Sequence, residues 1–522
     1  MQETAEPTHR PELIFALVGP AGTRLLDLSK ALKSSLSAFG YKATEIRLSK
    51  LLSGFAGWTP ESDQSEYVRI RHGQTIGNTF RNTLKNGAAL ALAGIATIRE
   101  QRRSITGSPD RPAPEQAYII NQLKHPDEVR LLRQIYGSSF ALVAGHAYRT
   151  KRIKELSELM AKNEHEVNLK LFEPKAFEII DIDEKQEDDL GQNTRDTYPL
   201  ADFFANLGPG GTENDVHRFV KLLFGHPFIT PTPEEYAMFQ ASSVSLRSAD
   251  ETRQVGAVIV NMTRDSKNIR NVDVVASGMN EVPRRGGGFY WDGIDSPDNR
   301  DQWLRAYRSQ DRASEIKISA LTELIGQIRQ KKWLDKTAAT VPDKELASSL
   351  LPTLRGTQFM GIGEFGRTVH AEMAALIDGA RRGVKINGGT MYVTTFPCHN
   401  CAKHIIAAGI RRVVYLEPYP KSRADFLHGE EIELEPEDGN IDHDKVAFCA
   451  FSGIAPRQYR QVFSMSERGE KKGPSLSQWD VEQRTLPPRY VTRYASSAYL
   501  AAERQELEKL RPEIWDAARV RP

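Results

Sequence analysis

The sequence predicts an α/β protein of more than one domain, and three observations indicate this class. The chain has 522 residues, of which 39% are hydrophobic and 26% charged, the balance of an ordinary globular protein. Short apolar runs alternate with stretches of helical apolar spacing, which favours parallel sheets covered by helices. The proline-rich segment GHPFITPTPEE at 225–235 resists both helix and strand, and therefore divides the chain into two such blocks.

The first block, residues 1–225, is predicted to be a parallel-sheet domain. LIFALVG at 13–19 is a strand candidate that ends in a glycine turn, and a helix follows it as far as Gly40. GAALALAGIATI at 87–98 is too short to span a bilayer and is expected to be a buried helix. Four further runs are strand candidates: KATEIRL, QAYIINQL, SFALVAG and AFEIIDI.

The second block, residues 226–460, is predicted to hold a second sheet. Its strand candidates are QVGAVIV (254–260), VDVVASG (272–278), TMYVTT (390–395) and RVVYLEP (412–418). Helices are expected after His370 and from Cys398, and a charged helical insertion at about 296–360. Residues 461–522 are polar and are expected to form a C-terminal helical extension.

Composition excludes several classes of protein. The formal net charge of +2 predicts neither a surface that coats nucleic acid nor an acidic tail. No apolar run approaches the roughly 18 residues of a membrane span. Three cysteines in so long a chain cannot form a disulfide framework. Together with an N-terminus that lacks a signal pattern, this predicts a cytoplasmic protein.

Two of the three cysteines stand close together, in the sequence TTFPCHNCAKH. Cys398 and Cys401 follow Pro397 at the start of a predicted helix, where unpaired N–H groups and the helix dipole favour thiolates. Upstream, VHAEM supplies His370 as a nitrogen ligand and Glu372 as a carboxylate that can move protons. Thiolate and imidazole suit Zn²⁺, and three protein ligands with one position left for water are typical of catalytic zinc. We therefore predict a zinc site at His370, Cys398 and Cys401.

Other interpretations of these residues stay open. A structural zinc knuckle or a redox pair would also use C-x-x-C, although a structural site would have a fourth ligand and no need of the glutamate. His399 or His404 could replace His370 as the nitrogen ligand. Cys449, the third cysteine, is interpreted as a small core residue.

The motif His370-Ala371-Glu372 … Pro397-Cys398-x-x-Cys401 has the H-x-E … P-C-x-x-C pattern of zinc nucleobase deaminases. The second block resembles the deoxycytidylate deaminase branch of the cytidine deaminase superfamily, through QVGAVIV, SGMNEVP, TVHAEMAAL and PCHNCAKHIIAAGIRRVVYLEPYPKS. With the first block included, the chain resembles the bacterial anti-phage dCTP deaminases. Supporting stretches are IGNTFR, AYIINQLKHPDEVRLLRQIYG, GQNTRDTYPLADFFANLG, RRGGGFYWDG, YPKSRADFLH and FSGIAPRQY.

The resemblance implies an N-terminal P-loop NTPase or kinase-like domain followed by a cytidine-deaminase-like α/β/α domain. It implies hydrolytic deamination of dCTP or dCMP to deoxyuridine nucleotides and ammonia, which would deplete dCTP during phage infection. The residues support this chemistry separately. Zinc lowers the pKa of its water toward 7, and Glu372 can carry protons to N3 of cytosine and to the leaving ammonia.

Candidate substrate contacts are less specific. Asn280 in SGMNEVP matches an asparagine that contacts sugar and base in the family, although N-x-x-P is also a common turn. Tyr419 and Lys421 follow the carboxyl end of a predicted strand, where sites gather, and could meet base and phosphates. Three arginines are candidates for binding a polyphosphate, with an exposed loop as the alternative for each: Arg284, Arg285 and Arg457.

The loop after the first strand has the strand-turn-helix context of a phosphate-binding loop. Gly19, Gly22 and Thr23 lie in it, but G-x-x-x-x-G-K-[ST] requires a lysine where Leu25 or Leu26 stands. Backbone amides at the helix start can still bind an anion. We expect a degenerate nucleotide-binding site, with Mg²⁺ accompanying a nucleoside triphosphate, or else a purely structural turn.

Two rival functions remain. A polynucleotide-editing deaminase would need a basic groove with aromatic residues for single strands, and the net charge does not favour it. A nucleotide sensor with structural zinc would not need Glu372. The expected partners are a deoxycytidine nucleotide, further copies of the chain in a homo-oligomer, and an inhibitory RNA or phage-derived trigger; no membrane is expected.

Overall fold

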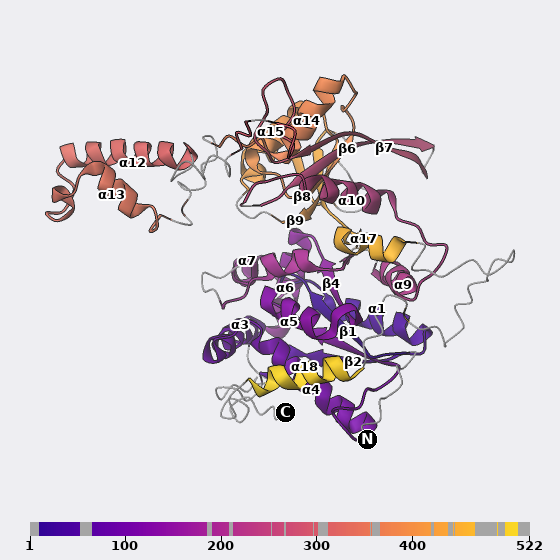
Figure 1. Ribbon diagram of the computed structural model, residues 1–522. Helices are drawn as coiled ribbons and strands as arrows, with labels where there is room; N and C mark the ends of the chain where they lie inside the picture. Colours follow the sequence, from indigo (N-terminus) through magenta and orange to yellow (C-terminus); the bar gives the residue numbers. More distant parts are fainter. Residues whose placement is uncertain are drawn as a thin grey trace. The chain divides into compact units, whose positions relative to one another are not determined.

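The protein has a mixed α/β architecture in a computed structural model (Figure 1). The structure describes residues 10–52, 65–184, 190–207, 212–251, 253–265, 268–295, 297–300, 312–354, 357, 366–418, 422–436, 442, 444–464, 488 and 496–509. The chain divides into two compact units. The first comprises residues 1–239, 415–418 and 433–522, and the second comprises 240–414 and 419–432.

A six-stranded sheet forms the centre of the first unit, in the order β12-β5-β4-β1-β3-β2. Its strands are β1 (Leu13–Val18), β2 (Lys42–Arg47), β3 (Gln116–Asn121), β4 (Phe140–His146), β5 (Phe203–Asn206) and β12 (Gly453–Ile454). Strands β1 to β5 pair in parallel, and β12 pairs antiparallel with β5. The predicted parallel sheet and its first four strands are confirmed.

One strand prediction was wrong. AFEIIDI lies in the helix α7 (Glu173–Glu184), and the fifth parallel strand is β5 instead. The residues of α7 that are buried are Ala176, Ile179, Ile180 and Asp183. Their i, i+3, i+4, i+7 spacing marks one face of a helix, which the short run of isoleucines concealed.

Helices surround this sheet. They are α1 (Leu25–Ala38), α2 (Leu48–Leu51), α3 (Glu66–Leu84), α4 (Ala89–Thr106), α5 (Pro126–Tyr136), α6 (Arg149–Asn163), α8 (Thr194–Thr197), α9 (Thr212–Leu223) and α17 (Pro456–Phe463). The helix α10 (Pro233–Ser245) lies against Gly256 instead, where an added Cβ would be 2.0 Å from the carbonyl oxygen of Ala241. Short 3-10 helices occupy Gly137–Ser139, Leu169–Leu171 and Tyr198–Leu200. The α1 and α9 helices contribute to the same core as β1, β3 and β5. The Ala-rich run at 87–98 is the buried helix that was predicted, as part of α4.

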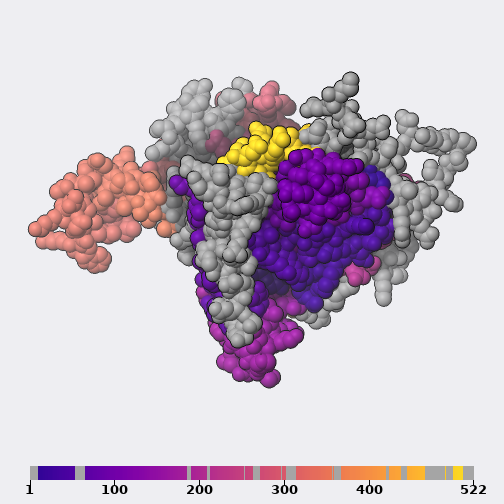
Figure 2. All heavy atoms as spheres, turned by 90° about the horizontal axis from the view of Figure 1, so that it is seen from below, coloured from indigo at the N-terminus to yellow at the C-terminus, as the bar shows by residue number. Residues whose placement is uncertain are grey.

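The C-terminal helix α18 (Ser496–Glu508) belongs to the first unit, where it packs against α4 and α5. Figure 2 shows it in yellow at the surface of the unit, beside N-terminal residues in indigo and purple. Its inner face carries Glu503, which is 0% exposed, and buried Leu500 and Leu507. The chain therefore returns to its N-terminal domain at its end, through a helix that has a buried charge.

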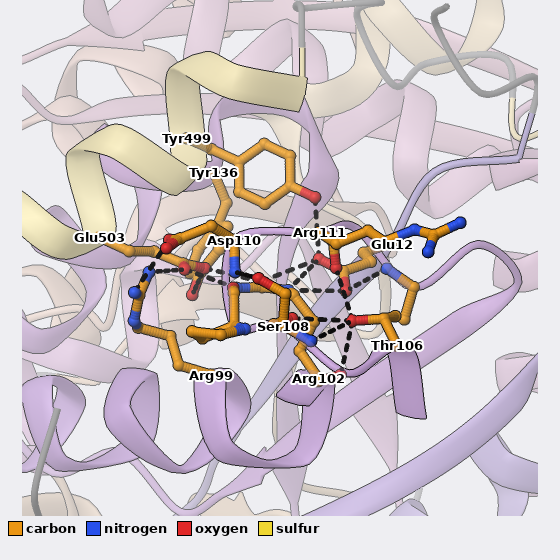
Figure 3. Close-up of polar contacts among 12 residues, drawn as sticks. Glu12, Arg99, Arg102, Thr106, Ser108, Asp110, Arg111, Tyr136, Tyr499 and Glu503 are labelled. Atoms are coloured by element: carbon orange, nitrogen blue, oxygen red, sulfur yellow. Dashed lines mark hydrogen bonds and ion pairs between the residues drawn. The ribbon is translucent and has the colours of Figure 1, made fainter. Parts of the chain in front are cut away.

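A buried ionic network holds α18 in place (Figure 3). The guanidinium of Arg102, on α4, lies between the carboxylates of Glu12 and Glu503 at 2.9 and 2.7 Å. The hydroxyl of Tyr136 donates to Glu503 at 2.8 Å, and that of Tyr499 donates to Glu12 at 2.8 Å. Buried charges are tolerated only when they are paired and hydrogen-bonded, so these contacts fix the position of the helix.

A second six-stranded sheet has the order β10-β11-β9-β8-β6-β7. Its strands are β6 (Gly256–Asp265), β7 (Asn268–Met279), β8 (Thr390–Thr395), β9 (Arg412–Glu417), β10 (Ile432–Leu434) and β11 (Val446–Ala450). β6 pairs antiparallel with both β7 and β8. The helices that accompany it are α14 (Ala371–Arg382), α15 (His399–Ala407) and α16 (Ala424–His428). The four strands and two helices predicted for this block are confirmed.

The predicted insertion contains two helices, α12 (Arg312–Gln330) and α13 (Asp343–Leu350), and a short 3-10 helix at Ala338–Thr340. They share an apolar core of their own around Ile318, Leu321 and Ala347. Among the helices that the structure describes, none is both long enough and apolar enough to cross a membrane. The predicted domain boundaries at 225 and 460 stay predictions.

Candidate active site

The helix α14 begins at the predicted nitrogen ligand. His370 is the N-cap residue, with extended backbone angles, and Glu372 lies in the first turn. The backbone of β7 approaches this turn very closely at Gly278, where an added Cβ would lie 2.4 Å from the carbonyl oxygen of Ala371. Only glycine permits this approach, so the sheet directly sets the position of the histidine and the glutamate.

The helix α15 begins in the same way at the first cysteine. Cys398 is its N-cap residue, and Cys401 lies in the first turn and is 0% exposed. Both sulfurs therefore lie at the positive end of the helix dipole, as the sequence predicted. The hydroxyl of Ser422 donates to the carbonyl oxygen of Pro397 at 2.8 Å and anchors the residue before the helix.

The three predicted ligands converge. The Nδ1 atom of His370 lies 3.4 Å from the Sγ atom of Cys398 and 3.3 Å from that of Cys401. A sulfur about 2.3 Å and a nitrogen about 2.05 Å from a tetrahedral zinc ion would lie about 3.6 Å from each other, close to these separations. One nitrogen and two sulfurs are also a donor set that zinc favours. The residues therefore fit a zinc ion, and they are the group in the described part of the chain that could hold a metal.

The pKa values of the three candidate ligands indicate that a bound cation would stabilise their metal-binding protonation states. A hydrogen bond from Cys401 lowers the pKa of Cys398 to about 4, and the same contact, with burial, raises the pKa of the Cys401 thiol far above its usual range. The hydrogen bond with Cys398 raises the pKa of His370 to about 8. Protein charges alone thus hold one thiolate, and the second thiolate requires a bound cation.

Glu372 differs from the ligands in its surroundings. Its side chain is 4% exposed, and burial raises the pKa of its carboxyl to about 7. His370 by contrast is exposed and Cys398 is half-buried. The site therefore has a solvent-facing side and a buried carboxyl that can change its protonation near neutral pH.

The alternative nitrogen ligands lie elsewhere on α15. The Nδ1 atom of His404 lies 2.6 Å from the carbonyl oxygen of Asn400, so a backbone contact already holds that ring. The Nδ1 atom of His399 is buried without a hydrogen-bond partner. Neither residue joins the cluster of His370 and the two cysteines among the described residues.

Asn280 is buried, and backbone groups occupy both ends of its amide. Its Oδ1 atom accepts from the N–H of Val255 at 2.7 Å, and its Nδ2 atom donates to the carbonyl oxygen of Arg253 at 2.7 Å. The side chain thus fixes the start of β6. A direct contact with substrate, which the sequence predicted, stays a prediction.

The predicted arginines belong to different units of the chain. Arg284 pairs with Asp295 at 2.9 Å, and Arg285 lies exposed in the same loop. Arg457 belongs to the first unit, where it donates to the carbonyl oxygen of Leu200 at 3.1 Å. Tyr419 and Lys421 lie outside the described residues.

Glu281 was not singled out from the sequence. It is 3% exposed, its Oε2 atom accepts from the N–H of Ala249 at 2.9 Å, and its backbone forms a two-way bridge with Val369. Because Val369 precedes His370, this bridge positions the candidate metal ligand. A carboxylate within the apolar surroundings of SGMNEVP was the signal that could have indicated it.

Comparison with known proteins finds a similarity over the part of the chain that contains this geometry. Residues 231–417 match the family model described as "Cytidine and deoxycytidylate deaminase zinc-binding region". Residues 231–417 are thus similar to that zinc-binding region. The match includes all three candidate ligands and Glu372, and it stops before the first unit's final strand.

Individual relatives match over shorter stretches. The chain is 45% identical over 69 residues to a deoxycytidylate deaminase of Enterobacteria phage T2, which is 13% of this chain and 37% of the phage protein. It is 49% identical over 53 residues to ComE operon protein 2 of Bacillus subtilis, 10% of this chain and 28% of that protein. The chain thus spans 37% or less of the length of these relatives.

Among solved structures, the dCMP deaminase of cyanophage S-TIM5 matches 43% of this chain and 100% of its own, at 16% identity and a TM-score of 0.21. The same enzyme with dCMP and dUMP matches at 17% identity, with a TM-score of 0.22. These scores are too low to assign any residue.

Proposed function

We propose that the protein is a zinc-dependent deaminase that converts deoxycytidine nucleotides into deoxyuridine nucleotides and ammonia. The observation that carries the proposal is a His-Cys-Cys cluster, open to solvent at His370, together with the buried carboxyl of Glu372. A structural zinc site would need a fourth protein ligand and would gain nothing from that carboxyl. Several relatives named deoxycytidylate deaminase support the choice of nucleotide.

His370, Cys398 and Cys401 would hold the metal. When bound, zinc lowers the pKa of a water toward 7 and so supplies a nucleophile at neutral pH. The N-terminus of the helix that begins at Cys398 stabilises the anionic sulfurs. His370, at the N-terminus of the other helix, lies on the solvent side of the cluster. These residues thus fix where the water and the base meet.

Glu372 would move the protons. Its carboxylate accepts a proton from the water that adds to C4 of cytosine, and delivers it to N3. The C4–N4 bond then breaks, with a second proton transfer to nitrogen, so that water and cytosine become uracil and ammonia. A carboxyl with a pKa of about 7 is suited to both directions of transfer.

The finer parts of the proposal rest on the family resemblance. They are a preference for dCTP over dCMP, depletion of dCTP as a defence against phage, a homo-oligomeric state in the cytoplasm, and control by an RNA or a phage product. Asn280, Arg284, Arg285, Tyr419, Lys421 and Arg457 stay candidates for binding the substrate. Mg²⁺ would accompany a triphosphate substrate.

The test is an assay of purified protein with dCTP, dCMP, CTP and a cytosine-containing DNA oligonucleotide, together with zinc analysis. Glu372→Gln should lose deaminase activity and keep zinc, because it removes the proton carrier and leaves the three ligands. Glu323→Gln, exposed on α12, is the matched control and should behave as wild type. Activity that survives in E372Q, or that appears only with the oligonucleotide, would contradict the proposal.

A further inference from the structure

The loop between β1 and α1 makes a tight turn at the carboxyl edge of the first sheet. Gly22 has a φ of +83°, and the N–H of Thr23 donates to the carbonyl oxygen of Pro20 at 3.1 Å. The helix α1 begins two residues later and has 14 residues. Such a turn at a helix N-terminus favours an anion.

An internal anion already contacts this loop. The carboxylate of Asp183, from the end of α7, accepts from the N–H of Ala21 at 2.8 Å. Its other oxygen lies 2.6 Å from the Nζ atom of Lys124, which also donates to the carbonyl oxygen of Gly19 at 3.0 Å. Asp183 is 2% exposed. One carboxylate thus receives both an amide and a cation, as a phosphate oxygen would.

A second cation beside the loop has two nitrogens without a hydrogen-bond partner. Arg152, on α6, is 6% exposed, and neither its Nε nor its Nη1 atom has a hydrogen-bond partner. Its closest carboxylate oxygen, on Glu184, lies 3.8 Å from Nη2, too far for a hydrogen bond. The backbone of Arg152 packs against Gly22, where an added Cβ would lie 2.7 Å from its carbonyl oxygen.

A buried guanidinium with unused donors is costly, because each donor has lost its water. The Oγ1 atom of Thr23 is also buried without a partner. Unused donors within the loop and beside it indicate a ligand that has several acceptor oxygens. Asp183 supplies two oxygens and leaves these donors unsatisfied.

We propose that Asp183 occupies one phosphate position of a polyphosphate site formed by the 19–23 loop, Lys124 and Arg152, and that a polyphosphate binds by displacing it. The loop has no lysine of its own, so Lys124 and Arg152 supply the positive charge for the ligand. The site is thus held closed by the chain itself, and its ligand competes with an internal carboxylate. This inference does not depend on the deaminase chemistry.

The test is calorimetric titration of the full-length protein with inorganic tripolyphosphate. Asp183→Asn keeps the shape and removes the competing charge. If Asp183 occupies the loop about nine-tenths of the time in the wild type, the apparent affinity of D183N for tripolyphosphate should be about tenfold higher. Asp181→Asn is the matched control, because Asp181 is an exposed carboxylate on the same helix that pairs with Arg149. Equal affinities of D183N, D181N and wild type, or no binding by any of them, would overturn the proposal.

Arginine variants test the cation. In the D183N background, Arg152→Gln should reverse the gain in affinity, and Arg149→Gln, a neighbour that is 44% exposed, should not. If D183N does not fold, the same pair is compared in the wild-type background, where R152Q should weaken tripolyphosphate binding about tenfold. The substitution is tolerable because two of the nitrogens that it removes make no hydrogen bond. An R152Q protein that binds as wild type does would refute the role of Arg152.

Discussion

Replacing Gly278 by alanine tests whether the β7 backbone positions the metal ligands. An alanine Cβ would lie 2.3 Å from the backbone nitrogen of Ala375 and 2.4 Å from the carbonyl oxygen of Ala371. Both atoms belong to α14, and neither can move without the helix. Since ordinary contacts are about 3.5 Å, the first turn must retreat by about 1 Å.

This shift would act on the site directly, because Ala371 lies between His370 and Glu372. A misplacement of about 1 Å can cost about 10²-fold in rate. Overpacking should also lower the free energy of unfolding by about 1–3 kcal/mol. We therefore expect Gly278→Ala to bind zinc more weakly and to lose about 10²-fold in kcat/KM on dCMP.

The measurements are zinc affinity by competition with a chromophoric chelator, kcat/KM by ammonia release, and thermal unfolding. Gly73→Ala in α3 is the matched control, since its added methyl group would meet nothing within 4 Å. A G278A protein with the zinc affinity and kcat/KM of wild type would show that β7 does not set the position of α14.

Three further predictions concern stability and metal. Burial raises the pKa of Glu435, but the charge and hydrogen bond of His146 and the hydroxyl of Tyr415 outweigh it and lower that pKa to about 2. The ionised Glu435 should therefore stabilise the fold fully above pH 4.5, its ordinary pKa, and lose this effect as the pH falls toward 2. In urea unfolding, Glu435→Gln should remove about 3 kcal/mol from the change in unfolding free energy over this pH range. Arg102→Met should cost about 3–5 kcal/mol, because it strands two buried carboxylates, whereas exposed Arg103→Met should cost under about 0.5 kcal/mol in the same melts. Chelation should abolish deamination, with recovery on addition of Zn²⁺; activity that persists in a metal-free sample would contradict the zinc site.

Local patterns were sufficient for much of the fold. Apolar runs bounded by glycine and polar residues predicted the strands β1 to β4. The motifs at His370 and Cys398 predicted where α14 and α15 begin. AFEIIDI failed because seven residues with three isoleucines satisfy the templates of both strand and helix, and only the packing of one face against α6 decides between them.

The contacts that the sequence did not predict join residues far apart in the chain. Asp183 lies 162 positions from the amide that it accepts from, and Glu503 lies 401 positions from Arg102. No local spacing signals such pairs, because they form only when the helices that carry them are packed. For the same reason the sequence did not show that the amide of Asn280 bonds to the backbone of residues 253–255; its contact with substrate stays a prediction.

The sequence by itself indicated the candidate donor set, because Cys398 and Cys401 lie within one helical turn, as do His370 and Glu372, and thiolate and imidazole suit zinc. It also determined the order of most strands and helices. Tertiary structure decided which unit Arg457 joins, which carboxylate fills the 19–23 loop, and how closely β7 approaches α14. These depend on the packing of surfaces across the fold, where a few tenths of an ångström separate contact from clash.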